Sequence, residues 1–447
     1  MRCSVAIVLF AASAAFANEY KAGVARIDIT PDGPIWMSGY ADRKHPSEGV
    51  VQPLAAKALA IEDSKGARVV IVSTDLIGLP RQITDEVAAR VQKQYGLERS
   101  HLVFNSSHTH TGPVVGPNLR MMFALDEENQ RRIDAYSRKL TEDLFSVIGA
   151  ALGDLAPAEI SYATGQAHFA VNRREPTANG MKIGVNPAGP FDPSVPVLKV
   201  TSADGKLRAV LFGYACHNTT LTGQFYQISG DYAGFAQAEM ESAHPGAAAL
   251  FIQLCGGDQN PNPRGSLQLA KTHGRTLAQE VDRVLTGPMQ PLHSPLRAVY
   301  INVELAFRFY TRERFENDLK DANAAKVHRA EAMLAAYDTR HPVRSTPYPI
   351  QAIRFGKDLT LVALGGEVVV DYALRVKREY PGNIIVAGYS NDVMSYIPTA
   401  RILQEGGYEA VDSMIYYGQP GPYADDVEER ILDGIHKVMK RVGISRQ

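Results

Sequence analysis

Short apolar runs of strand length alternate with longer amphipathic runs along the chain, and this alternation constrains the fold more than any other feature. Segments 67–75 and 101–107 have the length and apolar run of strands, whereas 83–96 and 129–155 repeat their apolar residues at helical spacing. Such alternation is typical of α/β proteins. We therefore expect an α/β fold with mixed β-sheets and flanking helices, built as a single domain because no segment resembles an interdomain linker.

Further elements follow from the same patterns. A hairpin is predicted over 196–217, with its turn at Asp204-Gly205. Helices are predicted over 266–285 and 312–338. The segment 172–196 is rich in Pro, Gly and Asn, and we expect it to form a surface loop that covers a site.

Residues 1–17 have the pattern of a secretion signal. Arg2 supplies a short positive start, an apolar stretch follows, and Ala15-Phe16-Ala17 fits an A-x-A cleavage site. We therefore expect cleavage after Ala17, a mature domain over 18–447, and export to the periplasm or the medium.

Composition excludes several classes of function. The 447 residues carry a formal net charge of -1 and no basic cluster, so a nucleic-acid partner is not expected. The single Trp gives little support to carbohydrate stacking. Beyond the signal only Cys216 and Cys255 remain, which is too few for a cysteine zinc site. A disulfide between them and two buried free thiols are both open.

Polar clusters recur where predicted strands end. They contain His108-Thr109-His110, His217, Glu367 and Tyr396. Because ligands of α/β sheets bind just outside the carboxyl ends of the strands, we expect these clusters to lie close together.

The pair His108 and His110 raises the question of a metal. Residues two apart on an extended chain face the same side, and neutral imidazole is a common zinc ligand. Either both bind one metal, or one binds it while the other contacts a substrate oxygen. Structural roles stay open at this point for these histidines, for His217, and for Glu367 as an acid near a helix N-terminus.

Two loop segments add candidate polar groups. The run CGGDQNPN, 255–262, is a strand-to-loop turn whose backbone N–H groups suit an oxyanion, or it is simply a tight turn. Arg173 or Arg174 is suited to clamp a polar substrate group, unless it is an ordinary solvated arginine.

Taken in order, the motifs resemble the catalytic domain of the neutral, or non-lysosomal, ceramidases. The run AGVARIDITP resembles the family's opening motif, SSHTHTGP its T-H-T-H-S-G-P signature and GGE its P-G-E motif. His217 with the following NTT, and then SGDYAGFAQ, is similar to its second histidine block, and AGYSNDVMSYIPT to its G-L-S-N-x-Y-x-x-Y-x-T-T segment. The resemblance covers most of the mature chain.

The resemblance implies a site with one Zn²⁺ per chain. The implied metal ligands are His108, His217, Glu367 and Tyr396. The implied catalytic residues include His110 beside the metal, Arg173, and Tyr408 in Gly407-Tyr408-Glu409, which aligns with the family's R-Y-E segment.

The chain departs from the family pattern in two places. Asn260 stands where the family's G-D-V-S-P-N carries a serine discussed as a nucleophile, and an amide side chain cannot take that role. We therefore expect a zinc-activated water to be the nucleophile. The chain also stops soon after the catalytic domain, so no counterpart of the family's C-terminal immunoglobulin-like domain is expected.

These inferences predict an exported zinc-dependent hydrolase that cleaves the amide bond of a ceramide-like N-acyl lipid, with peripheral contact to a membrane surface. His110 and Tyr408 are expected to stabilise the oxyanion, with Asn260 and its loop adding donors. The proton donor to the leaving amine is either His110 or Asp258. The alternatives are a zinc esterase, lactonase or peptidase acting on another substrate, and a zinc-binding homologue that has lost catalysis.

Overall fold

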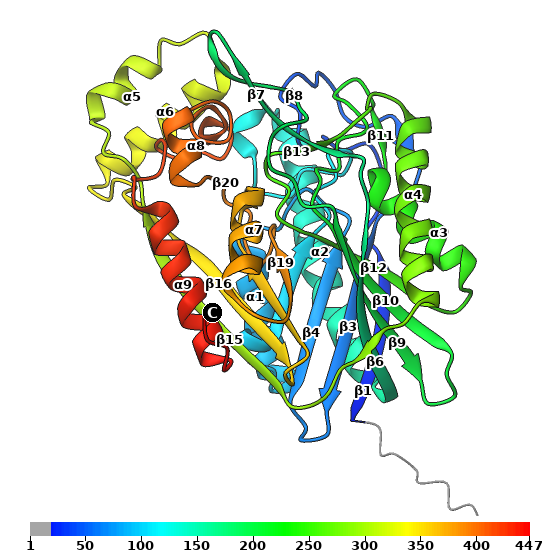
Figure 1. Ribbon diagram of the computed structural model, residues 1–447. Coiled ribbons are helices and arrows are strands. Elements are labelled where there is room, and N and C mark those ends of the chain that lie inside the picture. The colour runs from blue at the N-terminus through cyan, green and yellow to red at the C-terminus, as the bar shows by residue number, and fades with distance from the viewer. Residues whose placement is uncertain (1–18) are drawn as a thin grey trace, which may run out of the picture.

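Two β-sheets packed face to face form the body of the computed structural model, which describes residues 19–447 (Figure 1). The larger sheet has the strand order β12-β10-β9-β6-β1-β3-β4-β5, with β14 paired to β6. Its strands are β1 (Tyr20–Asp28), β3 (Ala55–Asp63), β4 (Arg68–Thr74), β5 (Leu102–Ser106), β6 (Ala156–Gln166), β9 (Ser194–Ser202), β10 (Leu207–Tyr214), β12 (Ala248–Gln253) and β14 (Gln290–Pro291).

The smaller sheet has the order β15-β16-β17-β19, and three minor sheets pair short strands near the site. The four strands are β15 (Leu296–Ala306), β16 (Ser345–Phe355), β17 (Leu359–Leu364) and β19 (Asn383–Ala387). The minor sheets are β13-β7-β8, with β13 (Gln259–Pro261), β7 (Ala170–Thr177) and β8 (Gly180–Asn186); β11-β2, with β11 (Gln227–Ile228) and β2 (Gly49–Val50); and β18-β20, with β18 (Glu367–Val368) and β20 (Tyr396–Ile397).

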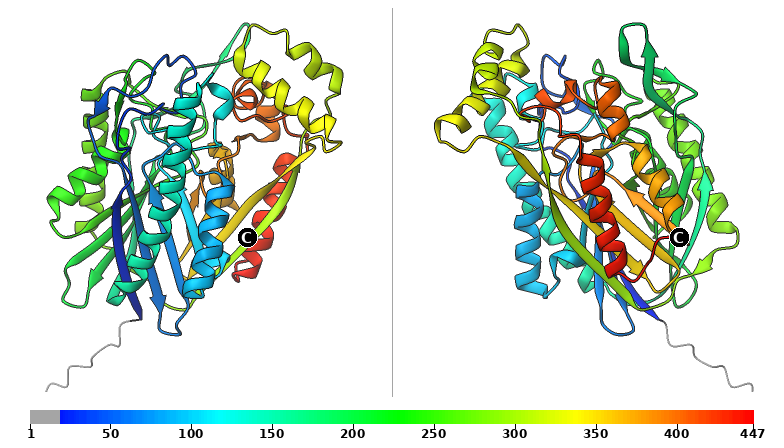
Figure 2. Two further views of the ribbon diagram at one scale, coloured as in Figure 1. Left: turned by 180° about the vertical axis from the view of Figure 1, so that it is seen from behind. Right: turned by 60° about the vertical axis from the view of Figure 1, so that its left-hand side comes forward.

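Helices cover the outer faces of both sheets, which gives four layers (Figures 1 and 2). The α-helices are α1 (Arg81–Tyr95), α2 (Glu127–Gly153), α3 (Asp231–Ala243), α4 (Leu267–Thr286), α5 (Arg312–Asp318), α6 (Ala324–Asp338), α7 (Val370–Glu379), α8 (Ala400–Glu405) and α9 (Val427–Arg441). Short 3-10 turns are η1 (Arg99–His101), η2 (Arg120–Met122) and η3 (Asp412–Ile415).

Apolar side chains fill each interface between layers. Leu59 of β3 and Leu361 of β17 belong to the cluster between the two sheets. The opposite face of the larger sheet packs on α1 and α2 at one end and on α3 and α4 at the other. The outer face of the smaller sheet packs on α7 and α9. Burial on both faces explains why strands such as β4 read as nearly continuous apolar runs.

Three parallel strand pairs define the place of the site. β4 pairs with β5, β10 with β12, and β17 with β19, each in parallel. Isolated bridges between Asn105 and Ser390, and between Leu254 and Ala387, join the two sheets just past these strand ends. The segments that follow the parallel strands therefore meet in the upper half of the molecule as drawn, near β13 and β20 (Figure 1).

The α/β class with mixed sheets is confirmed, and so is the hairpin over 196–217, which is β9 and β10 with Gly205 at φ 80° in the turn. The prediction of a loop over 172–196 was wrong, because most of it pairs as the β7–β8 hairpin. The helix predicted over 312–338 is interrupted between α5 and α6.

The predicted signal over 1–17 lies outside the described residues. Within 19–447, none of the helices combines the length and apolar character needed to cross a membrane.

Candidate metal centre

His108 and His110 lie in the loop that follows β5, and their imidazoles meet. The Nε2 atoms are 3.1 Å apart and the rings are nearly perpendicular, at 82°. The expected extended chain was wrong here, because His108 has φ 65°, in the left-handed region. The two rings converge because the chain turns at His108, not because they alternate along a strand.

His217 and Glu367 complete a tight cluster with His108. The Oε2 atom of Glu367 lies 2.9 Å from Nε2 of His108 and 3.0 Å from Nε2 of His217. The hydroxyl of Tyr396 lies 3.1 Å from the same Nε2 of His217. The four predicted metal ligands and His110 are thus brought together, and all of them are buried.

Backbone carbonyls fix the tautomer of each histidine. Nδ1 of His108 lies 2.6 Å from the carbonyl of Ile77, Nδ1 of His217 lies 2.7 Å from that of Gly256, and Nδ1 of His110 lies 3.1 Å from that of Gly39. A carbonyl only accepts hydrogen bonds, so each Nδ1 carries the proton and each Nε2 presents a lone pair.

This arrangement fits a cation. Three Nε2 lone pairs, whose atoms lie within 4.8 Å of one another, share the space with the Glu367 carboxylate. Oε2 of Glu367 is buried and has no hydrogen-bond partner among the described residues. Acceptors this close repel one another unless a positive charge lies between them. Histidines that bind a metal usually donate their other ring N–H to a backbone carbonyl, a carboxylate or water, as these three histidines do to carbonyls.

Burial and neighbouring charges set the protonation states of the side chains in the cluster. Burial and the nearby Arg173 cation lower the pKa of His217 to about 4, so its imidazole is neutral at pH 7. Burial raises the pKa of the Tyr396 hydroxyl, and Arg173 opposes that shift.

Arg173 lies on β7 and connects the cluster to Asn260 on β13. Its Nη2 donates to the Tyr396 hydroxyl at 2.9 Å, Nη1 to Oδ1 of Asn260 at 3.3 Å, and Nε to Oε1 of Glu409 at 2.8 Å. Oδ1 of Asn260 also accepts from Thr219 at 3.4 Å. The Asn260 amide is thereby oriented with its Nδ2 directed away from Arg173.

Tyr408 and Asp258 occupy different positions relative to the cluster. The Tyr408 ring meets the Tyr396 ring edge-on at 5.4 Å, and the Arg173 guanidinium lies 5.6 Å from its centroid. Asp258 is buried behind the site, where its oxygens accept from Nδ2 of Asn172 and the backbone N–H of Val370, both at 2.9 Å. Asp258 therefore caps the start of α7.

Tyr417 is a site residue that the sequence patterns missed. Its hydroxyl donates a hydrogen bond to Oε1 of Glu367. The two residues are 50 positions apart, and Tyr417 is one of 20 tyrosines, so no local spacing identifies the pair.

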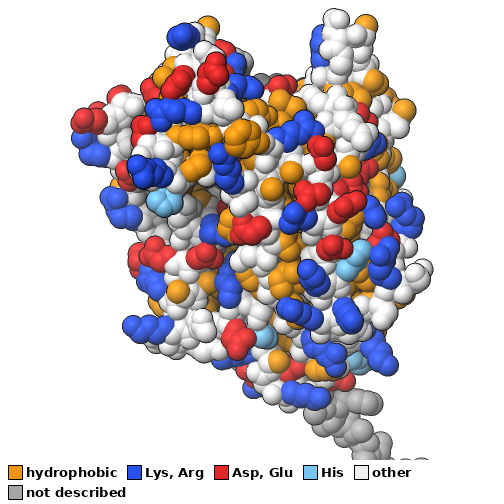
Figure 3. All heavy atoms as spheres, turned by 90° about the vertical axis from the view of Figure 1, so that its left-hand side faces the viewer, with side chains coloured by type: hydrophobic (Ala, Val, Ile, Leu, Met, Phe, Trp, Pro, Cys, Tyr) orange, Lys and Arg blue, Asp and Glu red, His pale blue; other side chains and the backbone are white. Residues whose placement is uncertain are grey.

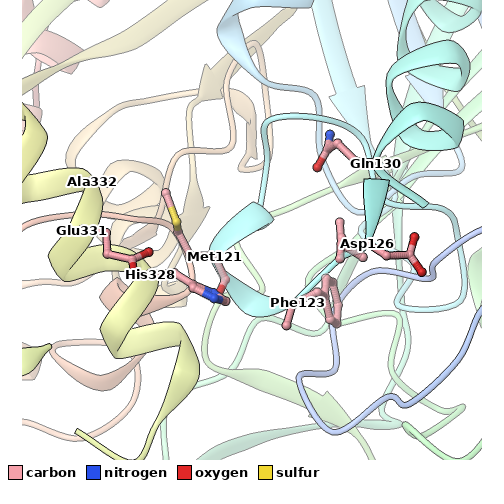
Figure 4. Close-up of a pocket in the computed structure, with 9 residues that line it drawn as sticks. Met121, Phe123, Asp126, Gln130, His328, Glu331 and Ala332 are labelled. Atoms are coloured by element: carbon pink, nitrogen blue, oxygen red, sulfur yellow. The ribbon is translucent and has the colours of Figure 1, made fainter. Parts of the chain in front are cut away.

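A surface hollow of about 530 Å³ opens between α6 and the segment from η2 to α2 (Figure 4). Met121 and Phe123 lie at its centre, with His328 and Glu331 on the α6 side and Asp126 on the other (Figure 4). The residues of the cluster do not line this hollow.

Cys216 and Cys255 are both buried free thiols, so the structure contains no disulfide between them. Cys216 belongs to the core cluster under α3 and α4, whereas Cys255 belongs to the cluster under α7 and α9.

Comparison with protein families gives a match over residues 20–279 to the neutral/alkaline non-lysosomal ceramidase N-terminal domain. This match covers more than half of the chain. The chain belongs to this family.

Curated relatives in the family are distant. A neutral ceramidase of Pseudomonas aeruginosa is 26% identical over 262 residues, which cover 54% of this chain and 37% of that protein. A neutral ceramidase of Mycobacterium tuberculosis is 23% identical over 454 residues, covering 83% of this chain and 70% of that protein. The matched region thus spans about a third of the Pseudomonas protein's length.

The fold agrees with the family assignment. The crystal structure of neutral ceramidase from Pseudomonas aeruginosa superposes with a TM-score of 0.73 at 20% identity, covering 95% of this chain and 75% of that chain. A structure titled as ceramidase complexed with C2 gives the same TM-score at 18% identity, over 96% of this chain and 76% of that one.

Proposed function

We propose that this chain is an exported zinc hydrolase that cleaves the amide bond of an N-acyl lipid of the ceramide class. The observation that carries the proposal is the convergence of histidine Nε2 lone pairs on the unpartnered Oε2 of Glu367, in a chain of the ceramidase family. The names of the curated relatives support the substrate class.

One zinc ion per chain would be held by His108, His217, Glu367 and Tyr396. Two nitrogen and two oxygen donors suit zinc. When bound, zinc polarises the scissile carbonyl and lowers the pKa of a water molecule toward ~7.

His110 is the best placed group for moving the proton. Its Nδ1–H is directed at the Gly39 carbonyl, so Nε2 is free to accept a proton from the attacking water and deliver it to the leaving amine. Burial and the neighbouring His108 lower the pKa of His110 well below its usual value, so its imidazole is neutral before the reaction. Asp258 is less suited, because both of its oxygens are engaged by Asn172 and Val370.

We assign the contacts with the oxyanion and the substrate to Tyr408, Asn260 and Arg173. Asn260 directs its amide N–H groups away from Arg173, where they are available to a substrate oxygen. Three of the five N–H groups of Arg173 donate to Glu409, Asn260 and Tyr396, and these bonds hold the guanidinium in the site. The other two N–H groups would bind the polar head of the substrate.

Exposed apolar side chains support contact with a lipid surface. Ile183 and Val185 of β8 are 51% and 48% exposed, and Phe309, just before α5, is 69% exposed. β8 and α5 both lie at the upper end of the molecule, toward which the site lies (Figure 1). On the face that carries α5 and α6, hydrophobic side chains gather in the upper part among Lys and Arg (Figure 3). This end would rest on the membrane that holds the substrate.

Vesicle co-sedimentation tests this contact. The double variant Ile183→Asp/Val185→Asp should lose binding to vesicles that contain anionic lipid. The control Ala203→Asp, which adds one negative charge in the β9–β10 turn at the lower end against the two of the double variant, should bind like the wild type (Figure 1). Equal binding of all three proteins would contradict the orientation.

Elemental analysis paired with hydrolysis of a fluorogenic long-chain N-acyl sphingosine tests the function. We expect about one zinc per chain and turnover that a chelator abolishes. Zinc without turnover would reject ceramide and leave the metal site standing. A chain without bound zinc would reject the proposal as a whole.

Asn260 favours one alternative, a zinc esterase, lactonase or peptidase that acts on another substrate. The amide replaces a family serine, so the polar group presented to the substrate differs. A series of acyl chain lengths separates the two functions, because a lipid amidase should prefer long chains.

Export is tested by the N-terminal sequence of the protein recovered from the host cell. A mature chain that starts at Asn18 is expected, and an uncleaved Met1 would contradict export through a cleaved signal.

A further inference from the structure

The two carboxylate oxygens of Glu367 have different surroundings, because Tyr417 donates a hydrogen bond to only one of them. The phenolic O–H donates to Oε1. Oε2 has no hydrogen-bond partner among the described residues and lies 2.9 Å from Nε2 of His108 and 3.0 Å from Nε2 of His217. One oxygen is therefore engaged by the protein, and only the other is left for a metal.

We propose that Tyr417 is a positioning residue that commits Glu367 to bind the metal through a single oxygen, Oε2. The inference rests on the zinc centre of the proposed function. A carboxylate released from such a hydrogen bond is able to bind through both oxygens. The second oxygen would then occupy the open position that a catalytic zinc site keeps for water or substrate.

The surroundings of Tyr417 hold its hydroxyl in place. Its ring meets the Tyr396 ring at 80°, with centroids 6.4 Å apart, so one side chain contacts two predicted ligands. Tyr417 and its neighbour Tyr416 also pack against the large core cluster that contains Phe123. This packing restricts the ring, so the hydrogen bond to Glu367 costs little further conformational entropy.

Tyr417 belongs to the segment 407–419, and other residues of this segment contact Tyr396 and Arg173. Tyr408 packs edge-on against Tyr396, and Glu409 accepts from Nε of Arg173 at 2.8 Å. Tyr417 is the member of this segment that reaches Glu367 directly.

The test compares Tyr417→Phe with Tyr416→Phe. The first removes only the hydroxyl that donates to Glu367, and the second removes the neighbouring hydroxyl, which makes no contact with Glu367. Zinc affinity is measured by competition with a chromophoric chelator. We expect zinc affinity to change by about 10- to 100-fold for Tyr417→Phe, the range typical of second-shell partners, and by less than twofold for Tyr416→Phe. Equal affinities for Tyr417→Phe and the wild type would overturn the proposal.

Coordination number gives a readout independent of activity. Cobalt(II) replaces zinc, and the intensity of its visible absorption falls as coordination number rises. Tyr417→Phe should show weaker absorption than both the wild type and Tyr416→Phe, because Glu367 gains a second bond to the metal. An unchanged spectrum would contradict the assigned role.

The wild type alone provides a test that does not depend on the variant folding. A crystal structure of the zinc-loaded protein should place Oε2 of Glu367 at ~2.0–2.2 Å from zinc and leave Oε1 hydrogen-bonded to Tyr417. Two carboxylate oxygens on the metal would overturn this inference while leaving the proposed function intact. A wild type that binds no zinc would instead reject the proposed function.

Discussion

Nη2 of Arg173 donates to the hydroxyl of Tyr396 at 2.9 Å, and the same hydroxyl lies 3.1 Å from Nε2 of His217. A guanidinium beside a phenol stabilises the phenolate, which is the form that binds a metal. Burial raises the pKa of Tyr396, and Arg173 is the nearby group that opposes this rise. Arg173 is therefore positioned to stabilise the metal-binding form of Tyr396, in addition to its proposed contact with the substrate.

Arg173→Lys should lower both activity and zinc affinity, by about 10- to 100-fold. A lysine keeps the charge but cannot reproduce the fork that reaches Glu409, Asn260 and Tyr396 together. Arg401→Lys is the control, because Arg401 makes exposed ion pairs on α8. Steady-state kinetics and chelator competition check the prediction, and a variant that keeps full zinc affinity would separate Arg173 from the metal.

His108→Ala should reduce bound zinc from about one per chain to near zero. His273→Ala is the matched control. His273 is also buried, but it lies away from the cluster and stacks on Phe169 with ring centroids 4.6 Å apart. Thermal unfolding with and without a chelator gives a second readout. Zinc at 1,000 times its Kd stabilises the folded state by ~4 kcal/mol, so the wild type and His273→Ala should respond to the chelator and His108→Ala should not. Zinc retained in His108→Ala would refute the ligand assignment.

The sequence predicted which polar residues gather together better than it predicted the path of the chain around them. The alternation of strands and helices located the parallel strand ends, and His108, His217 and Glu367 follow those ends as expected. The local conformation could not be read from spacing, since the φ of 65° at His108 is set by tertiary contacts such as the bond from its N–H to the Leu76 carbonyl.

Two kinds of feature were beyond sequence reasoning. Helix α3 was missed because residues on most of its faces are buried, from Tyr232 to Met240, so the amphipathic period that marks a surface helix is absent. Tyr417 was missed because its partner Glu367 is brought to it by the fold alone, across 50 residues. The ion pairs of Glu409 with Arg173 and Arg174 are long-range in the same sense.

Asn260→Ser tests whether the amide has taken over a substrate contact. The variant restores the residue that the family pattern carries. Zinc content should not change, because Asn260 lies next to Arg173 and not among the predicted ligands. We expect KM for the N-acyl substrate to change by about tenfold, the worth of one hydrogen bond of ~1.4 kcal/mol, with kcat within a few-fold. A rise in kcat of several orders of magnitude would show that a serine is needed for the chemistry.

Asp258→Asn should change the pH dependence of stability in a defined direction. Burial raises the pKa of Asp258 to about 6 in the folded chain, from 3.8 in the unfolded chain. Between about pH 4 and pH 6 the folded protein therefore holds a proton that the unfolded chain has released. The free energy of unfolding falls as pH rises through this window and is level above it. The total loss is about 3 kcal/mol at most, since each pKa unit corresponds to ~1.4 kcal/mol.

Denaturant unfolding of the metal-free wild type and Asp258→Asn across this window measures the effect. The absence of metal removes the pH dependence of zinc binding from the comparison. Asp231 and Asp392 also have pKa values raised to about 6 by burial, but their contributions are shared by both proteins and cancel in the difference. The wild type should lose stability relative to the variant as pH rises, even though the variant's absolute stability shifts with the altered cap of α7. Parallel curves would mean that Asp258 is already ionised at pH 4 and that its bonds to Asn172 and Val370 outweigh its burial.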